Sequence, residues 1–128
     1  MASNYLDRET YPYSEFFGVE ILEANENTAE GRFRAREEFT DMLGHMTGGA
    51  YASLADAIGG AAARATGDMY VTQNCSLQFY QSTEPCDEVL IAKATVRHRG
   101  SRTCIVAVEL QHQDGTVVCD GQFSYSKI

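Results

Sequence analysis

The sequence predicts an α+β domain in which an antiparallel sheet packs against one long helix. The helix is indicated by residues 48–65, of which twelve of eighteen are alanine or glycine. Short segments rich in strand-forming residues lie on both sides of it, separated by turn residues. Several strands grouped around a single helix are typical of the α+β class.

The segment ahead of the first strand carries no long apolar run. Pro12 favours the start of a short helical turn, which Gly18 would end. We expect residues 1–12 to be a loose arm or to dock on a partner subunit. Residues 36–46, between the second strand and the helix, are polar and predict a loop.

The alanine- and glycine-rich helix is predicted to be buried and central. Thr47 is a good N-cap, because its hydroxyl can accept a hydrogen bond from a free amide of the first turn. Small residues on all sides allow close approach of other backbone. Only Asp56 and Arg64 are charged in the segment, and a lone carboxylate in such a helix is unexpected because burying an unpaired charge is costly.

Six segments are predicted to be strands. They are residues 19–24, 28–35, 69–80, 89–98, 103–113 and 117–126. The last four supply three or four antiparallel strands. Hairpin turns are expected at residues 99–102 and 114–115, whereas Glu84-Pro85 interrupts the strand pattern. One helix covers only one face of the sheet, so the other face is expected to meet a partner subunit.

Length, charge and cysteine content narrow the class of protein. The 128 residues suit one domain spanning residues 1–128. A net charge of −8 and a pI near 4.7 argue against nucleic acid or an anionic membrane as a partner. The four cysteines fit no zinc pattern, so no metal site is expected. With no signal peptide or membrane span in view, we expect a cytoplasmic protein of a reducing compartment.

One stretch is similar to a known family. Gly48-Gly49 followed by Leu54-Ala55-Asp56, between a polar loop and a strand, resembles the PaaI-like hotdog-fold thioesterases. Their usual signature is Asn, a Gly, then His-Gly-Gly, with an Asp eight residues after the first Gly of that pair. Here Asp41 stands in place of the Asn and Thr47 in place of the His. The resemblance covers residues 16–125 and implies a hotdog fold, in which the sheet wraps around one long central helix. It also implies homodimers or homotetramers with shared active sites.

The resemblance assigns the central chemistry to Asp56, as general base or nucleophile towards a thioester. Gly48 and Gly49 would donate backbone N–H groups to the thioester carbonyl, since a helix start favours developing negative charge. Two structural alternatives stay open: Asp56 pairs with Arg64 or water, and the glycines serve tight packing. A direct pair with Arg64 is geometrically poor, because the two residues are two turns apart.

The loop before the helix offers three further candidates. Thr47 could donate a hydrogen bond to a substrate oxygen, although it cannot carry charge as His can, or act only as the N-cap. Asp41 cannot donate an amide hydrogen, and close to Asp56 it would raise a carboxylate pKa. His45 could supply the missing imidazole or simply be solvated.

The remaining candidates lie on strands and in one hairpin. Family members often place a Ser or Thr where Thr72 stands, close to the carboxylate across the dimer, where it positions a water; the alternative is an ordinary strand threonine. Asn74 on the same face is a weaker candidate. A basic hairpin would bind the coenzyme A phosphates, or be only a solvated turn. Its residues are Arg97, Arg99, Gly100 and Arg102.

The function predicted is hydrolysis of an acyl-coenzyme A thioester to the free acid and coenzyme A, without a metal or redox cofactor. The first alternative is a non-catalytic hotdog protein that binds an acyl ligand, suggested by Asp41 and Thr47. The second is a hotdog dehydratase or hydratase, which needs a His with a carboxylate; His45 is the only nearby His. The acyl group and the choice between dimer and tetramer stay open.

Overall fold

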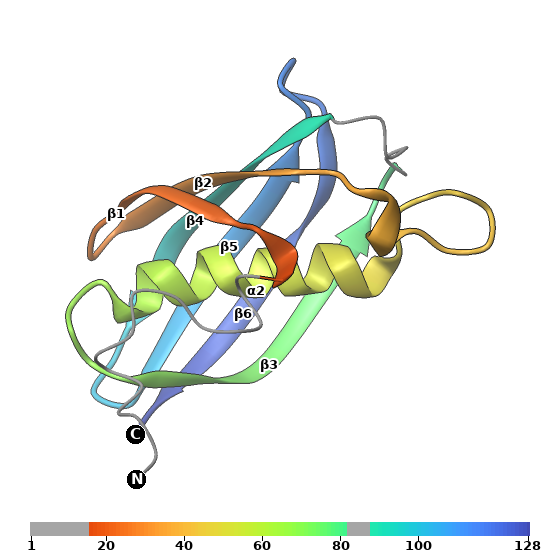
Figure 1. Cartoon of the computed structure of the whole chain (residues 1–128). Coiled ribbons are helices and arrows are strands. Elements are labelled where there is room, and N and C mark those ends of the chain that lie inside the picture. The colour runs from red at the N-terminus through yellow and green to blue at the C-terminus, as the bar shows by residue number, and fades with distance from the viewer. Residues whose placement is uncertain (1–15, 82–87) are drawn as a thin grey trace, which may run out of the picture.

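The computed structural model describes residues 16–81 and 88–128 (Figure 1). The expected arm at residues 1–12 and the break at Glu84-Pro85 lie outside these ranges. The described elements, in chain order, are β1 (Glu20–Ala24), β2 (Thr28–Arg34), a 3₁₀ turn η2 (Glu37–Phe39), α2 (Gly48–Arg64), β3 (Tyr70–Phe79), β4 (Val89–Arg99), β5 (Thr103–Gln111) and β6 (Val117–Lys127).

The strands form one six-stranded antiparallel sheet in the order β1-β2-β4-β5-β6-β3. Helix α2 lies across the sheet, and the strands curve around it (Figure 1). The α+β architecture with a single central helix is therefore confirmed. The four segments after the helix are four strands, and β3 pairs with the last strand, so that β1 and β3 are the two edges.

The helix begins and ends where the sequence predicts. The Thr47 hydroxyl accepts a hydrogen bond from the Ala50 amide at 3.2 Å, which confirms the N-cap. The side facing the sheet is buried, and Leu54, Ala55 and Ile58 are fully inaccessible to solvent. Large strand side chains and small helix side chains thus share one core.

Strand alternation follows burial closely in β2, where exposed and buried residues alternate over the whole strand. The β3 strand differs, because nearly all of it is exposed at the open edge of the sheet. Val71 and Phe79 of β3 are each about half exposed. The open edge leaves one side of this strand without a partner strand.

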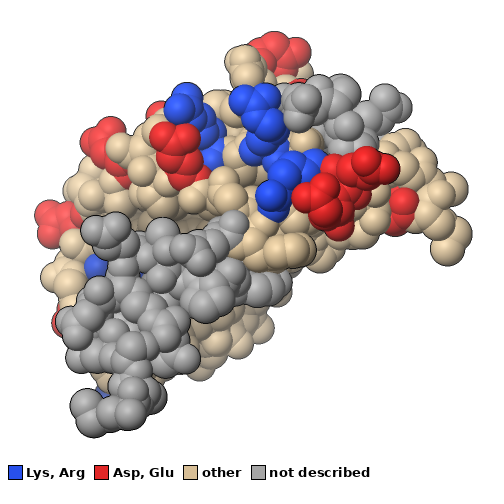
Figure 2. Space-filling model, viewed as in Figure 1, with Lys and Arg blue, Asp and Glu red and all other residues tan. Residues whose placement is uncertain are grey.

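The surface carries both charges, and the three described cysteines are free thiols. Figure 2 shows basic and acidic side chains next to one another on one face, in keeping with ion pairs such as Arg32–Glu20 at 2.9 Å. Cys75, Cys104 and Cys119 form no disulfide, while Cys86 lies outside the described residues. Within the described ranges, no helix is long and apolar enough to cross a membrane.

Candidate functional site

Asp56 lies in the middle of α2 and receives two hydroxyl hydrogen bonds from the sheet. Thr72 of β3 donates to Asp56 Oδ1 at 2.8 Å, and Tyr125 of β6 lies 3.1 Å from the same oxygen. The Tyr125 hydroxyl is also 3.0 Å from the backbone carbonyl oxygen of Asp56. Thr72 and Tyr125 face each other in the β3–β6 register. The pairing of these two strands therefore builds the polar environment of the carboxylate.

The position of Thr72 differs from the one that the resemblance implies. The resemblance places this hydroxyl next to the carboxylate across a dimer, whereas here both groups belong to one chain. The alternative partner Arg64 does not pair with Asp56; its guanidinium donates to the Tyr70 carbonyl at 3.2 Å. Among the described residues, Asp56 makes no ion pair within 4 Å. It is thus a partly buried carboxylate whose side-chain partners in the described residues are two hydroxyl groups and no cation.

Gly48 and Gly49 lie exposed at the start of α2, where the backbone amides point out of the helix. A Cβ added at Gly49 would meet nothing within 4 Å, and one at Gly48 would meet only the Phe79 ring at an ordinary 3.8 Å. Packing against the described residues therefore does not require glycine at either position. Gly48 lines an open pocket together with Met46, Tyr51, Phe79, Tyr80 and Gln81.

Asp41 organises the loop before the helix. Its Oδ1 accepts hydrogen bonds from the amides of Leu43 at 2.8 Å and His45 at 3.1 Å. These bonds, that from His45 first, lower the pKa of Asp41 below its usual value. This is the opposite of the raised carboxylate pKa that proximity of Asp41 to Asp56 would cause. In the described residues, no hydrogen bond joins Asp41 or His45 to Asp56.

The basic hairpin lies at the other end of the helix. Arg99 donates to the carbonyl oxygens of Ala62 at 3.1 Å, Ala63 at 3.0 Å and Glu26 at 2.9 Å. It therefore satisfies carbonyl groups at the C-terminal end of α2, where a cation is also favoured by the helix dipole. Arg97 and Arg102 are exposed.

Within the described residues, no hydrogen bond joins the hairpin turn or the weaker strand candidate to Asp56. Gly100 donates its amide to the Thr103 carbonyl at 2.8 Å and so closes the turn between β4 and β5. Asn74 is exposed on the edge strand β3. Within the described residues of one chain, Asp56 is therefore hydrogen-bonded to Thr72, and to none of Asn74, the hairpin residues, Gly48 and Gly49.

Tyr125 is the site residue that sequence reasoning missed. Its side chain is fully buried, and a buried tyrosine hydroxyl normally has a hydrogen-bond partner. Burial above all, and then the negative charge of Asp56, raises the pKa of Tyr125 well above its usual value. The hydroxyl thus keeps its proton and acts as a donor. The available signal was a tyrosine at an inward position of the last strand and a helix carboxylate without a partner.

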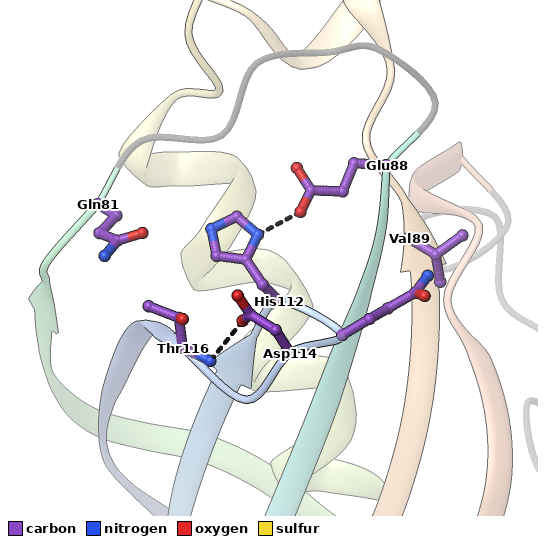
Figure 3. Close-up of a pocket in the computed structure, with 7 residues that line it drawn as sticks. Gln81, Glu88, Val89, His112, Asp114 and Thr116 are labelled. Atoms are coloured by element: carbon purple, nitrogen blue, oxygen red, sulfur yellow. Dashed lines mark hydrogen bonds and ion pairs between the residues drawn. The ribbon is translucent and has the colours of Figure 1, made fainter.

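A second pocket, with a polar lining, lies where β3 and β5 end and β4 and β6 begin (Figure 3). Figure 3 shows His112 pointing towards Glu88, to which its ring Nδ1 is hydrogen-bonded, and the Thr116 amide donating to Asp114 at 2.9 Å. This hydrogen bond lowers the pKa of Asp114. The pair is a His with a carboxylate, as a dehydratase needs, but both groups are engaged with each other and neither hydrogen-bonds to the Asp56 network.

Comparisons with known proteins agree with this architecture. A conserved protein of Pseudomonas aeruginosa, PA5202, is 26% identical with a TM-score of 0.86, covering 93% of this chain and 95% of its own. A hypothetical thioesterase of Streptococcus pneumoniae TIGR4, solved with coenzyme A, is 24% identical with a TM-score of 0.81, covering 86% and 85%. The Escherichia coli PaaI protein of the phenylacetic acid degradation operon is 23% identical with a TM-score of 0.88, covering 94% and 86%.

The family comparison gives the same result over more than half of the sequence. No match is found among curated proteins. The sequence pattern of the thioesterase superfamily matches residues 43–119, which include the whole of α2 and Thr72. Together with the six-stranded sheet around one helix, the match confirms the expected hotdog fold. The chain therefore belongs to the thioesterase superfamily and shares the fold of the Escherichia coli PaaI protein.

Proposed function

We propose that this protein hydrolyses an acyl-coenzyme A thioester to the free acid and coenzyme A. The observation that carries the proposal is the Asp56 carboxylate, which Thr72 and Tyr125 hold on a buried helix and which forms no ion pair with any described residue. A carboxylate in this state can accept a proton from an attacking water or attack the carbonyl carbon itself. In the first route the water oxygen replaces sulfur on the acyl carbon and gives the free acid directly. In the second, Asp56 displaces the sulfur to form an acyl-aspartate anhydride, which a water then hydrolyses to the free acid. In both routes the carbon–sulfur bond breaks, and the coenzyme A thiolate takes up a proton that comes from the water.

The spacing of Asp56 and Thr72 supports their role. Two further structures of the Streptococcus pneumoniae protein are variants in which a threonine and an aspartate, sixteen positions apart, are each replaced by alanine. Asp56 and Thr72 have the same separation. Thr72 donates its proton to Asp56, so its oxygen remains able to accept a hydrogen bond from a water. Thr72 would thereby hold the attacking water next to the carboxylate.

The carbonyl group of the substrate would be polarised by the amides of Gly48 and Gly49. These amides point away from Asp56, which lies seven residues beyond Gly49 or about 10 Å along the helix axis. A carbonyl bond is only about 1.2 Å long, so the amides and carboxylate of one chain cannot both serve it. We therefore propose a homo-oligomer, dimer or tetramer, in which the helix start of one subunit faces Asp56 of another.

Coenzyme A is the proposed carrier, since the Streptococcus pneumoniae thioesterase was solved with it. The exposed Arg97 and Arg102 would pair with its phosphates, and the pocket containing Tyr51 and Phe79 would take apolar parts of the substrate. Arg99 is already engaged with helix carbonyl groups, so its first role is to support the fold.

A second candidate function is binding of an acyl ligand without catalysis. It is favoured by the loop before α2, where the Asp41 carboxylate and the Thr47 hydroxyl both accept backbone hydrogen bonds. Neither supplies the imidazole that stands in the family signature. If the imidazole is indispensable, the pocket would bind but not cleave.

A thiol-release assay over acyl-coenzyme A esters, from acetyl to long-chain and aryl, tests the proposal. Catalytic release of coenzyme A from at least one ester is expected, with no added metal. Calorimetry with the same esters provides the control for binding. Tight binding without release across the panel would replace the enzyme by the binding protein.

A further inference from the structure

We infer that Tyr125 is a positioning residue for Asp56, and that Oδ2 of Asp56 is the oxygen that reacts. The inference rests on the proposed thioesterase function and adds a residue and an atom to it. Thr72 and Tyr125 both approach Oδ1, at 2.8 and 3.1 Å. In the described residues, Oδ2 accepts no hydrogen bond. Oδ1 is thus occupied by the two donors, and Oδ2 is left to accept a proton from water or to attack the carbonyl carbon.

The Tyr125 hydroxyl fixes the carboxylate relative to the helix itself. The same hydroxyl lies 3.0 Å from the backbone carbonyl oxygen of Asp56 and 3.1 Å from Oδ1. One proton shared between these two acceptors links the side chain to its own backbone. Thr72 approaches from the neighbouring strand and completes a fork around Oδ1. Holding a reacting group in one orientation is a recognised source of rate.

Tyr125 is itself held in place by packing. Its side chain is fully buried, and its ring stacks on Phe123 with the centroids 5.9 Å apart and the planes 15° apart. Burial also keeps the phenol protonated, as its raised pKa indicates. The hydroxyl is therefore a fixed donor and not a proton carrier.

The helix provides the space for this hydroxyl at Gly59. A Cβ at Gly59 would lie 2.4 Å from Tyr125 Oη, 3.3 Å from its Cζ and 3.1 Å from Cγ1 of Val108. The hydroxyl is the nearest of these atoms. Glycine weakens a helix interior, so its presence three residues after Asp56 agrees with a requirement for the hydroxyl at this point. The Tyr125 hydroxyl therefore occupies space that any larger side chain at position 59 would need.

The first experiment compares Tyr125→Phe with the wild type in thiol release over a range of pH. The variant keeps the ring and its stacking but loses the donor. We expect kcat to fall about 10-fold at neutral pH with little change in KM, because the carboxylate is less well oriented. Because the Tyr125 hydroxyl donates to the carboxylate proposed to react, its loss should also change the acidic limb of the pH profile, which a purely structural role would not move.

Tyr70→Phe is the matched control, since Tyr70 is also buried but makes no hydrogen bond with Asp56. It should leave kcat and the pH profile unchanged. Melting temperature and sedimentation are measured for every variant. Gly59→Ala is the second probe, because it displaces the hydroxyl without deleting it. Added to Tyr125→Phe, Gly59→Ala should lower kcat little further, so that the two effects are not additive.

Three outcomes would overturn the inference. The first is an unchanged kcat and pH profile in a folded Tyr125→Phe, while Asp56→Asn loses turnover; the proposed function would then stand. The second is a uniform loss at every pH that Tyr70→Phe shares, which would reduce Tyr125 to packing. If Tyr125→Phe does not fold, an unchanged kcat in Gly59→Ala decides against the inference. Full turnover in Asp56→Asn would contradict the proposed function itself.

Discussion

At the scale of single residues, Asp41 stands in place of the Asn of the family signature and still accepts the hydrogen bonds that fix the loop. The family signature has Asn where this chain has Asp41. Both side chains offer an oxygen that can accept backbone hydrogen bonds, and Asp41 accepts two, from Leu43 and His45. The loop conformation before the helix therefore does not require the amide. Thiol release by Asp41→Asn tests whether an amide at this position also promotes turnover.

We predict that Asp41→Ala lowers stability at neutral pH and that the difference from wild type disappears in acid. The pKa of Asp41 is lower in the folded chain, mainly through the His45 amide and then the Leu43 amide. Such a group stabilises the fold above its unfolded pKa, about 3.9, and the effect is lost as pH falls through the lower folded pKa. Asp41→Asn, which keeps an acceptor, is the control. Thermal unfolding from pH 2 to 7 checks this, and an equal difference at both extremes would contradict it.

At the scale of elements, helix α2 is tied at both ends by side chains. Thr47 satisfies an amide at its start, and Arg99 satisfies carbonyl groups of Ala62 and Ala63 at its end. The same arginine donates to Glu26 in the turn between β1 and β2. Arg99 therefore joins three elements that are distant in the sequence: the first hairpin, the helix and β4.

Arg99→Ala is expected to lower the free energy of unfolding by roughly 1–3 kcal/mol, because carbonyl groups lose charge-assisted donors. Arg102→Ala, an exposed position in the same hairpin, should change it by less than about 0.5 kcal/mol. Denaturant unfolding provides the measurement. If Arg99 also bound the nucleotide, its loss would raise KM for an acyl-coenzyme A ester far more than for a pantetheine thioester. Equal effects on both esters are predicted, together with the lower stability.

The positions of the helix and strands along the sequence were predictable, but the strand order and the contacts between distant residues were not. Composition and N-cap gave helix α2, and alternation with turn residues gave the six strands to within about two residues at most ends. Strand order depends on pairings between segments far apart, such as β3 with β6. Tyr125 reaches Asp56 from 69 positions away, so the sequence could nominate Asp56 and Thr72 without showing the third member of the network.

At the scale of the whole molecule, the open β3 edge and the divided site both point to assembly. The edge carries Val71, Phe79 and Tyr80, all of them substantially exposed, and an unpaired edge is a template for a second chain. The backbone amides at the helix start point away from Asp56 of the same chain. A partner that pairs near β3 would also approach Phe79, which lines the pocket at Gly48.

Sedimentation at micromolar concentration should show a dimer or tetramer. Val71→Lys should shift the equilibrium towards the monomer, because a two-fold interface would contain the new charge twice. Leu22→Lys is the matched control on β1, the opposite edge, with 49% exposure against 46% for Val71, and should have no such effect. A stable wild-type monomer of about 14 kDa would remove the shared site.

The most direct test of the central claim is turnover by Asp56→Asn. The Asn side chain keeps an oxygen that can accept from Thr72 and Tyr125, so the variant should fold with a melting temperature equal to or above that of wild type. It loses the charge and the proton-accepting ability, so kcat should fall by about 10²–10⁴-fold with KM little changed. The measurement is steady-state thiol release from the best acyl-coenzyme A ester, with melting and sedimentation on the same samples. A folded oligomer of Asp56→Asn with kcat within a few-fold of wild type would contradict the account.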